Sequence, residues 1–170
     1  KHANKFDRIL YHFGNSIFHQ HMFDLIHKHP GVVVLHDFFL SGIAAHMELT
    51  GIKSNFWKNS LYHSHGYLAL QERYNSADIA ELIWKFPTNL PALQDAMGVI
   101  VHSAYAYELA NRFLGKKFSE QFRIIPQLRR LPQAPDRKTE RQNLGFSNAD
   151  FLLCSFGIMS STKMNHRLLQ

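Results

Sequence analysis

One short apolar run, GVVVL over residues 31–35, constrains the fold more than any other part of the chain. The run is uninterrupted and rich in β-branched residues, and Pro30 precedes it. Such a run is typical of a strand buried on both faces, as in a parallel sheet. His36 and Asp37 follow at once. Because ligands bind beyond the carboxyl ends of the strands in an open α/β sheet, His36 is our candidate catalytic residue.

Strands alternate with helical patterns along the rest of the chain. We also expect strands over residues 8–13, 98–101, 122–125 and 151–156. Apolar residues recur at helical spacing over residues 18–26, 38–47, 67–84 and 106–113, with a break expected near residues 75–76. We expect residues 51–59 to be irregular and residues 141–144 to form a last helical turn. This alternation predicts an α/β fold, with a Rossmann-like parallel sheet and flanking helices.

The composition narrows the class of protein. With 170 residues, 45% of them hydrophobic, the chain can form one domain, or one domain and part of another. Cys154 is the one cysteine, which excludes a disulfide framework and favours a reducing compartment, so we expect a cytoplasmic protein. No apolar run is long enough to span a membrane. The abrupt ends suggest a segment of a longer protein.

The formal net charge of +6 raises the question of a nucleic-acid partner. The basic residues are scattered, and the sequence contains no recognition-helix signature and no aromatic ribonucleoprotein motif. A basic surface suits anionic small molecules or acidic lipid headgroups equally well. We therefore expect no nucleic-acid partner, and we keep a peripheral contact with an anionic membrane as an alternative.

Three of the expected strands have a histidine at or next to their carboxyl end: His12, His36 and His102. Because the carboxyl ends of parallel strands share one edge, these side chains can line one crevice. A plainer interpretation is that each histidine donates a hydrogen bond to a local carbonyl, and we favour it for His12 and His102. For His36, which precedes Asp37 and a helix, both interpretations stay open.

The evidence for a metal site, a serine nucleophile or a phosphate-binding loop is weaker. The chain has 12 histidines, but the close pairs lie two residues apart, and there is no cysteine cluster and no HExxH motif, so we expect no metal. Ser103 lacks the nucleophile-elbow motif and suits a helix cap, as does Asp37 before Phe38. The loop from Ser155 to Lys163 suits a diphosphate site made by helix N–H groups and a lysine; the alternative is an exposed lysine in a first helical turn.

Five segments resemble the family 4 glycosyltransferases, specifically the bacterial polysaccharide-type members. In chain order they are YHFGNSIFH (11–19), PGVVVLHDFFL (30–40), VIVHSAYAYELA (99–110), RIIPQL (123–128) and SFGIMSSTKMNHRLL (155–169). The resemblance covers nearly the whole chain, and its most specific pieces are PGVVVLHD and VIVHS.

The resemblance implies the GT-B architecture, in which two Rossmann-like domains face each other. On that analogy residues 1–130 are the second half of the acceptor-side domain, 131–147 are the interdomain linker, and 148–170 begin the donor-nucleotide domain. His36 matches the family's histidine at the reaction centre. Gly14 and Asn15 match a turn at the acceptor cleft, and we add Asp37 and Ser103 to the candidate substrate-binding residues.

Gly157 and Lys163 match the family's binding site for the donor diphosphate. Ile158 stands where the family usually has an arginine, Met164 replaces the glycine after the lysine, and Gln127-Leu128 replaces a common Asn-Gly. The family's paired-glutamate motif has no counterpart in these residues. Among the matched sites, we expect the diphosphate site to differ most from that of the family.

The sequence thus predicts a retaining, metal-independent glycosyltransferase that needs no cofactor and moves a sugar from a nucleotide-sugar to a glycan or lipid-linked acceptor. We expect a role in bacterial polysaccharide biosynthesis, in the cytoplasm or at the inner face of the membrane. Two alternatives remain: a sugar-nucleotide epimerase of GT-B-like fold, and a non-catalytic interaction domain derived from a glycosyltransferase. We expect the 170-residue segment alone to be inactive, because the donor site of such a transferase needs residues outside it.

Overall fold

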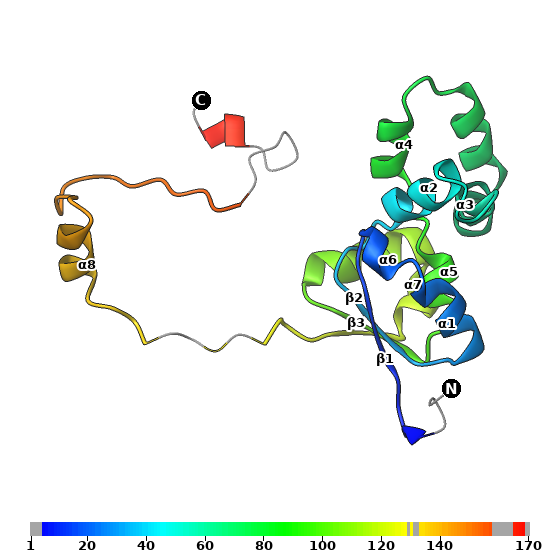
Figure 1. The fold of residues 1–170 in the computed structure, drawn as a ribbon, viewed down its shortest axis with the longest axis horizontal. Helices are drawn as coiled ribbons and strands as arrows, with labels where there is room; N and C mark the ends of the chain where they lie inside the picture. Colours follow the sequence, from blue (N-terminus) through cyan, green and yellow to red (C-terminus); the bar gives the residue numbers. More distant parts are fainter. Residues whose placement is uncertain (1–4, 129, 131–132, 158–164, 169–170) are drawn as a thin grey trace. The chain divides into compact units, whose positions relative to one another are not determined.

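The computed structural model describes residues 5–128, 130, 133–157 and 165–168 (Figure 1). The chain divides into two compact units, Lys1–Leu128 and Arg129–Gln170, which we treat separately. The predicted functional boundaries at residues 130 and 147 stay predictions. Among the described residues, no helix has the length and apolar character needed to cross a membrane.

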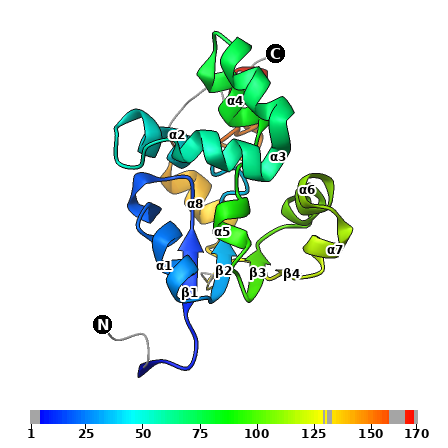
Figure 2. The same cartoon turned by 90° about the vertical axis from the view of Figure 1, so that its right-hand side faces the viewer.

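The first unit is built on a parallel sheet of four strands in the order β1-β2-β3-β4 (Figure 2). The strands are β1 (Leu10–Phe13), β2 (Val32–Leu35), β3 (Gly98–Val101) and β4 (Phe122–Ile124). Their register aligns Phe13 with Leu35, Val34 with Ile100, and Val101 with Ile124. The predicted α/β fold with a Rossmann-like parallel sheet is confirmed.

The two faces of the sheet differ in what covers them within this unit. One face joins the sheet core, a cluster of buried residues that includes Tyr11, Phe13, Val33, Leu35, Val99, Val101 and Phe122 together with residues of the flanking helices. On the opposite face, Leu10 is 53% exposed and His12 is exposed. Right-handed crossovers between strands in consecutive order place the connecting helices on one face, which explains the asymmetry.

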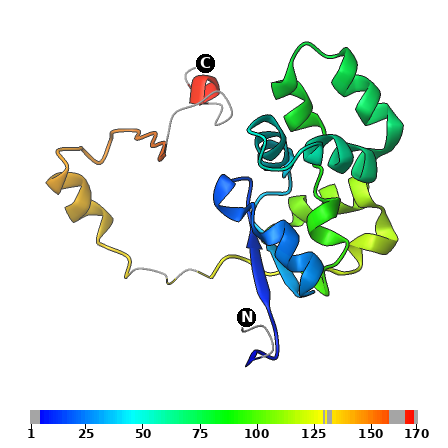
Figure 3. The same ribbon diagram turned by 45° about the vertical axis from the view of Figure 1, so that its right-hand side comes forward.

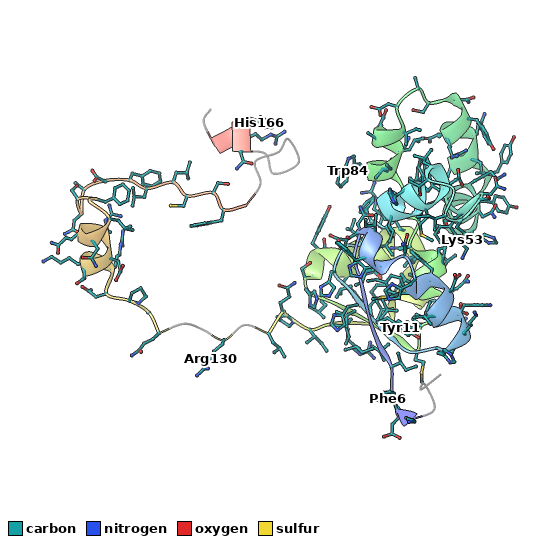
Figure 4. The ribbon with its side chains drawn as sticks, in the orientation of Figure 1. Phe6, Tyr11, Lys53, Trp84, Arg130 and His166 are labelled. Atoms are coloured by element: carbon teal, nitrogen blue, oxygen red, sulfur yellow. The ribbon has the colours of Figure 1, made fainter. Side chains whose placement is uncertain are left out.

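Eight α-helices and short 3₁₀ turns complete the described chain. The helices are α1 (Met22–Lys28), α2 (Ser41–Leu49), α3 (Phe56–Asn75), α4 (Ile79–Lys85), α5 (Leu90–Leu93), α6 (Ala104–Leu114), α7 (Lys116–Ser119) and α8 (Arg137–Asn143), and the 3₁₀ turns are η2 (Ile17–His19) and η4 (Asn165–Leu168). α1 packs beside β1 on the core side of the sheet (Figure 3). Tyr11, labelled in Figure 4, donates a hydrogen bond of 2.7 Å to the carbonyl of His29, just beyond α1.

The predicted helices are close to the observed ones, with one clear exception. Residues 51–59 were expected to be irregular, yet α3 begins at Phe56, because Trp57 and Leu61 are fully buried against Ala44 and Ala45 of α2. This packing between distant segments is absent from any local pattern. The predicted break near residues 75–76 lies between α3 and α4, where the Asp78 carboxylate accepts hydrogen bonds from Ala80 N and Glu81 N.

The helices α2, α3 and α4 form what we call the helical lobe, beyond the carboxyl ends of the strands (Figures 1 and 2). Buried polar contacts connect its parts. The Trp57 Nε1–H donates to Ser41 Oγ at 3.1 Å, and the Thr88 hydroxyl donates to the same oxygen at 3.1 Å. Arg73 forms an ion pair with Glu48. The lobe is therefore fixed by hydrogen bonds as well as by apolar packing.

The second unit has little regular structure among its described residues. α8 begins at Arg137, and the Asp136 carboxylate accepts hydrogen bonds from Thr139 N and Oγ1, which lowers the pKa of that carboxyl. α8 is longer than the helical turn expected near residues 141–144. The strand expected over residues 151–156 is not formed, and the side chains there are exposed. A strand needs a hydrogen-bonded neighbour, and the described residues offer none.

Candidate functional site

Three imidazole rings form a row along the carboxyl edge of the sheet. His12 Nδ1 lies 2.9 Å from His36 Nε2, and His36 Nδ1 lies 3.3 Å from His102 Nε2. The ring centroids are 5.2 Å and 5.1 Å apart. We call His12, His36 and His102 the histidine row. The sequence left open whether these three side chains meet at one edge or bond to local carbonyls, and the structure brings their rings together.

Strand geometry explains the row. His36 N donates to Phe13 O at 2.8 Å, so the hydrogen bonding of the sheet continues past the end of β2. Continuing the register from Leu35 and Val101 places His36 beside His102, and His12 lies two residues before their level on the same face. Side chains on one face of neighbouring strands approach closely enough to interact. The row therefore arises because the strands pair in parallel and because alternate residues of a strand lie on the same face of the sheet.

The hydrogen bonds of the row determine the tautomer of each neutral ring. His102 Nδ1 lies 2.8 Å from Ile125 O, and a carbonyl oxygen only accepts, so this nitrogen carries the proton. His102 Nε2 then accepts from His36 Nδ1–H. His36 Nε2 in turn accepts from His12 Nδ1–H. Each neutral ring therefore carries its proton on Nδ1, and the remaining lone pair of the row is on His12 Nε2.

The pKa of His36 is lowered from its ordinary value. Burial is the largest cause, followed by the neighbouring imidazoles of His102 and His12; Asp37 opposes the shift and His19 adds slightly to it. Although the side chain of His36 is exposed by area, its ring lies between two other rings, which displace water from it. A lowered pKa keeps His36 neutral at pH 7, as the tautomer assignment requires.

The predicted turn residues Gly14 and Asn15 lie next to the row and are fixed in place. Asn15 N donates to Asp37 Oδ2 at 2.8 Å, and Ile43 N donates to Asn15 Oδ1 at 2.8 Å. A side chain at Gly14 would place its Cβ 3.2 Å from that same Asp37 oxygen. The loop after β1 is therefore tied to the loop after β2 and to the first turn of α2.

Asp37 does not cap a helix, contrary to the prediction. α2 begins at Ser41, its N-cap position is Leu40, and no side chain caps it. Phe38 and Leu40 are instead buried in the sheet core, which holds this segment out of the helix. The carboxylate of Asp37 is engaged by Asn15, so its role is to join two loops at the edge of the sheet.

Ser103 caps α6, as the sequence predicts. Its Oγ accepts a hydrogen bond from Ala106 N at 3.2 Å, and Gly115, whose φ is +83°, directly follows the last residue of α6. Ser103 directly follows His102, so it borders the row. This contact explains the serine structurally, and substrate binding by Ser103 stays a prediction.

The predicted diphosphate site belongs to the second unit. Gly157 is exposed and has a φ of +111°, a conformation that favours glycine. Lys163 lies outside the described residues, as do the departures at Ile158 and Met164. Diphosphate binding by this loop therefore stays a prediction.

The sequence analysis underestimated His12. We favoured local hydrogen bonds to carbonyls for both outer histidines, which holds for His102 with Ile125 O but not for His12, whose partner is His36. The alternation within β1, where His12 is exposed between buried Tyr11 and Phe13, is the signal that places it on the same face as the other two.

The row is a chain of hydrogen bonds and not a set of ligands around one point. Each contact uses a different nitrogen of His36. Across the part of the chain that the structure describes, no group of three or more histidine, cysteine, aspartate or glutamate side chains is arranged to hold a metal ion.

Comparison of the chain with known protein families, with curated proteins and with solved structures finds no match. Fold and site geometry therefore have to carry any functional argument.

Proposed function

We propose that this chain belongs to a retaining glycosyltransferase of GT-B architecture, which transfers a sugar from a nucleotide-sugar to a glycan or lipid-linked acceptor in bacterial polysaccharide biosynthesis. The observation that carries the proposal is the histidine row at the carboxyl edge of a parallel sheet. This edge is where α/β sheets bind ligands. Neutral imidazoles suit the hydroxyl groups of sugars, because they form directional hydrogen bonds without introducing charge.

The surroundings of the row support the same proposal. The loop of Gly14 and Asn15 is held by Asp37 and by α2, so a substrate at this edge would meet a preformed wall. In the proposed mechanism, the ring of His36, whose two nitrogens are held by His12 and His102, shapes the reaction centre, while Lys163 supplies positive charge to the departing diphosphate. The bond from the anomeric carbon to that diphosphate breaks, and its electron pair leaves with the phosphate oxygen. The oxygen of the acceptor hydroxyl bonds to the anomeric carbon, and the hydroxyl proton passes to the departing diphosphate.

The one-sided packing of the sheet supports the proposed domain layout. Parallel sheets are ordinarily covered on both faces, but in the described first unit Leu10 and His12 are exposed on the face opposite the sheet core. This is expected of half of a doubly wound domain, as residues 1–130 are on the GT-B analogy. The same analogy makes residues 131–147 a linker and assigns the region from residue 148 to the donor side.

A place in the cytoplasm or at the inner face of the membrane completes the proposal. Exposed aromatic side chains on the helical lobe, such as Tyr67 at 71% and Trp84 at 60%, favour a peripheral contact with the membrane (Figure 4 labels Trp84). The formal charge of +6 adds attraction to anionic lipids.

The first experiment is a calorimetric titration of the protein that contains this chain with nucleoside diphosphates and nucleotide-sugars, with and without EDTA. The proposal predicts tight binding of one nucleotide that EDTA does not change. Failure to bind any of them would favour the interaction domain. An assay of products then separates sugar transfer from epimerisation, because an epimerase changes the nucleotide-sugar without an acceptor.

A further inference from the structure

We propose that His12 Nε2 is a binding site for a hydroxyl group of the carbohydrate acceptor, with His36 and His102 as positioning residues that fix its tautomer. The identity of the ligand rests on the proposed function; the tautomer does not. The inference starts from the end of the histidine row. In the described part of the chain, every ring nitrogen of His36 and His102 has a hydrogen-bond partner, whereas His12 Nε2 has none.

The row fixes what this free nitrogen can bind. Because the Ile125 carbonyl only accepts, His102 carries its proton on Nδ1, and this fixes the donor and acceptor nitrogens of His36 and then of His12. His12 Nε2 is left with a free lone pair. In free histidine the proton lies more often on Nε2. His12 is therefore held in the less common form, as a hydrogen-bond acceptor. It accepts from a hydroxyl, and it offers nothing to a carbonyl or to a fully ionised phosphate.

The position of His12 indicates which substrate presents that hydroxyl. His12 is exposed on β1, two residues before Gly14 and Asn15, and that turn is the one proposed to border the acceptor cleft. A donor sugar is proposed to lie at His36 instead. We therefore assign His12 Nε2 to the acceptor. Loss of this nitrogen should weaken binding of the acceptor and leave binding of the donor unchanged.

The other polar and charged groups near the row do not change its tautomers. Asp37 accepts from Asn15 N, and His19 approaches Gly14 through its Nε2. Arg123 is at the level of His12 in the register of the sheet, but its Nη1 donates to the carbonyls of Glu120 and Phe122. The polarity of the row is thus determined by Ile125 O.

The tautomers are measured by ¹⁵N NMR of the imidazole rings at about pH 8, above the ordinary histidine pKa of about 6.5. The expected result is a proton on Nδ1 in all three rings of the wild type. His102→Phe keeps a ring but removes both hydrogen bonds, so His12 should shift toward the common Nε2–H form. His63→Phe is the matched control, because His63 is exposed and stands apart from the row. A proton on Nε2 of His12 in the wild type overturns the proposal.

The ligand is tested by steady-state transfer with the protein that contains the chain. His12→Phe should raise the KM for the carbohydrate acceptor about tenfold or more, by the loss of one desolvated hydrogen bond, with the KM for the nucleotide-sugar unchanged. His102→Phe should raise the acceptor KM less, and His63→Phe should leave it unchanged. An unchanged acceptor KM in His12→Phe overturns the proposal. Absence of sugar transfer by the wild type overturns the proposed function and the assignment of a carbohydrate as the ligand of His12. The NMR experiment still decides the tautomers of the three rings in that case.

Discussion

The sheet core and the helical lobe are stabilised in different ways. The sheet core is an apolar cluster that spans all four strands, and its largest members, such as Phe13 and Phe122, make no polar contacts through their side chains. The lobe buries fewer apolar side chains. Two hydroxyls and an indole N–H are buried with them, and a partly buried imidazole accepts a further hydrogen bond. We expect the core to respond to changes of volume, and the lobe to respond to lost hydrogen bonds and to pH.

The largest effect is expected in the sheet core. Phe13 is fully buried between Tyr11 and Phe23, so Phe13→Ala should lower the free energy of unfolding by roughly 3–5 kcal/mol. Chemical denaturation measures the change. Phe18→Ala is the matched control, because Phe18 is 79% exposed and should change the free energy by less than about 0.5 kcal/mol. Equal losses in the two variants would contradict the placement of the core.

A smaller loss is expected from a single hydroxyl in the lobe. Ser41→Ala removes the acceptor shared by the Trp57 indole and the Thr88 hydroxyl, both fully buried. Leaving buried donors unpaired costs roughly 1–3 kcal/mol, although the change in volume is small. Ser54→Ala, at an exposed position in the loop before α3, provides the control in the same denaturation experiment. If both serines behave alike, the lobe does not depend on its polar contacts.

The third effect depends on pH and also arises in the lobe. His65 Nε2 accepts a hydrogen bond from Thr88 N at 3.2 Å, and burial lowers its pKa to about 4. Between the ordinary pKa near 6.5 and this value, the unfolded chain binds a proton that the folded chain does not. The contribution is therefore complete above about pH 6.5, and is lost as the pH falls toward 4.

Because His65 is only partly buried, we expect a loss on the order of 1 kcal/mol from this group. Denaturation at several pH values measures it. His65→Gln retains an acceptor for Thr88 N and does not titrate, so its stability should change less over this window. A variant with the same pH dependence as the wild type would show that another group is responsible.

The comparison also shows what the sequence could predict. The four strands of the first unit were predictable because apolar, β-branched runs such as residues 31–35 are local signals, and the edge location of His36 followed from them. The strand predicted over residues 151–156 was wrong, because a local apolar run does not supply a hydrogen-bonded neighbour. The start of α3 at Phe56 could not be predicted, because it depends on Trp57 packing against α2. The tautomers of the row depend on the main-chain carbonyl of Ile125, which directly follows β4, and a main-chain carbonyl has no signature in the sequence. Both features depend on contacts between residues far apart in the sequence, which local sequence patterns do not reveal.

The row itself is tested most directly by the turnover of His36→Ala in the protein that contains this chain, measured beside its free energy of unfolding. Because His36 is exposed, its removal should change stability by less than about 1 kcal/mol. We predict that sugar transfer falls by roughly a hundredfold or more, because the loss of this ring reshapes the reaction centre and releases His12 from its hydrogen bond, while His63→Ala keeps full turnover. Unchanged turnover in a folded His36→Ala protein would contradict the account and remove the histidine row from the site.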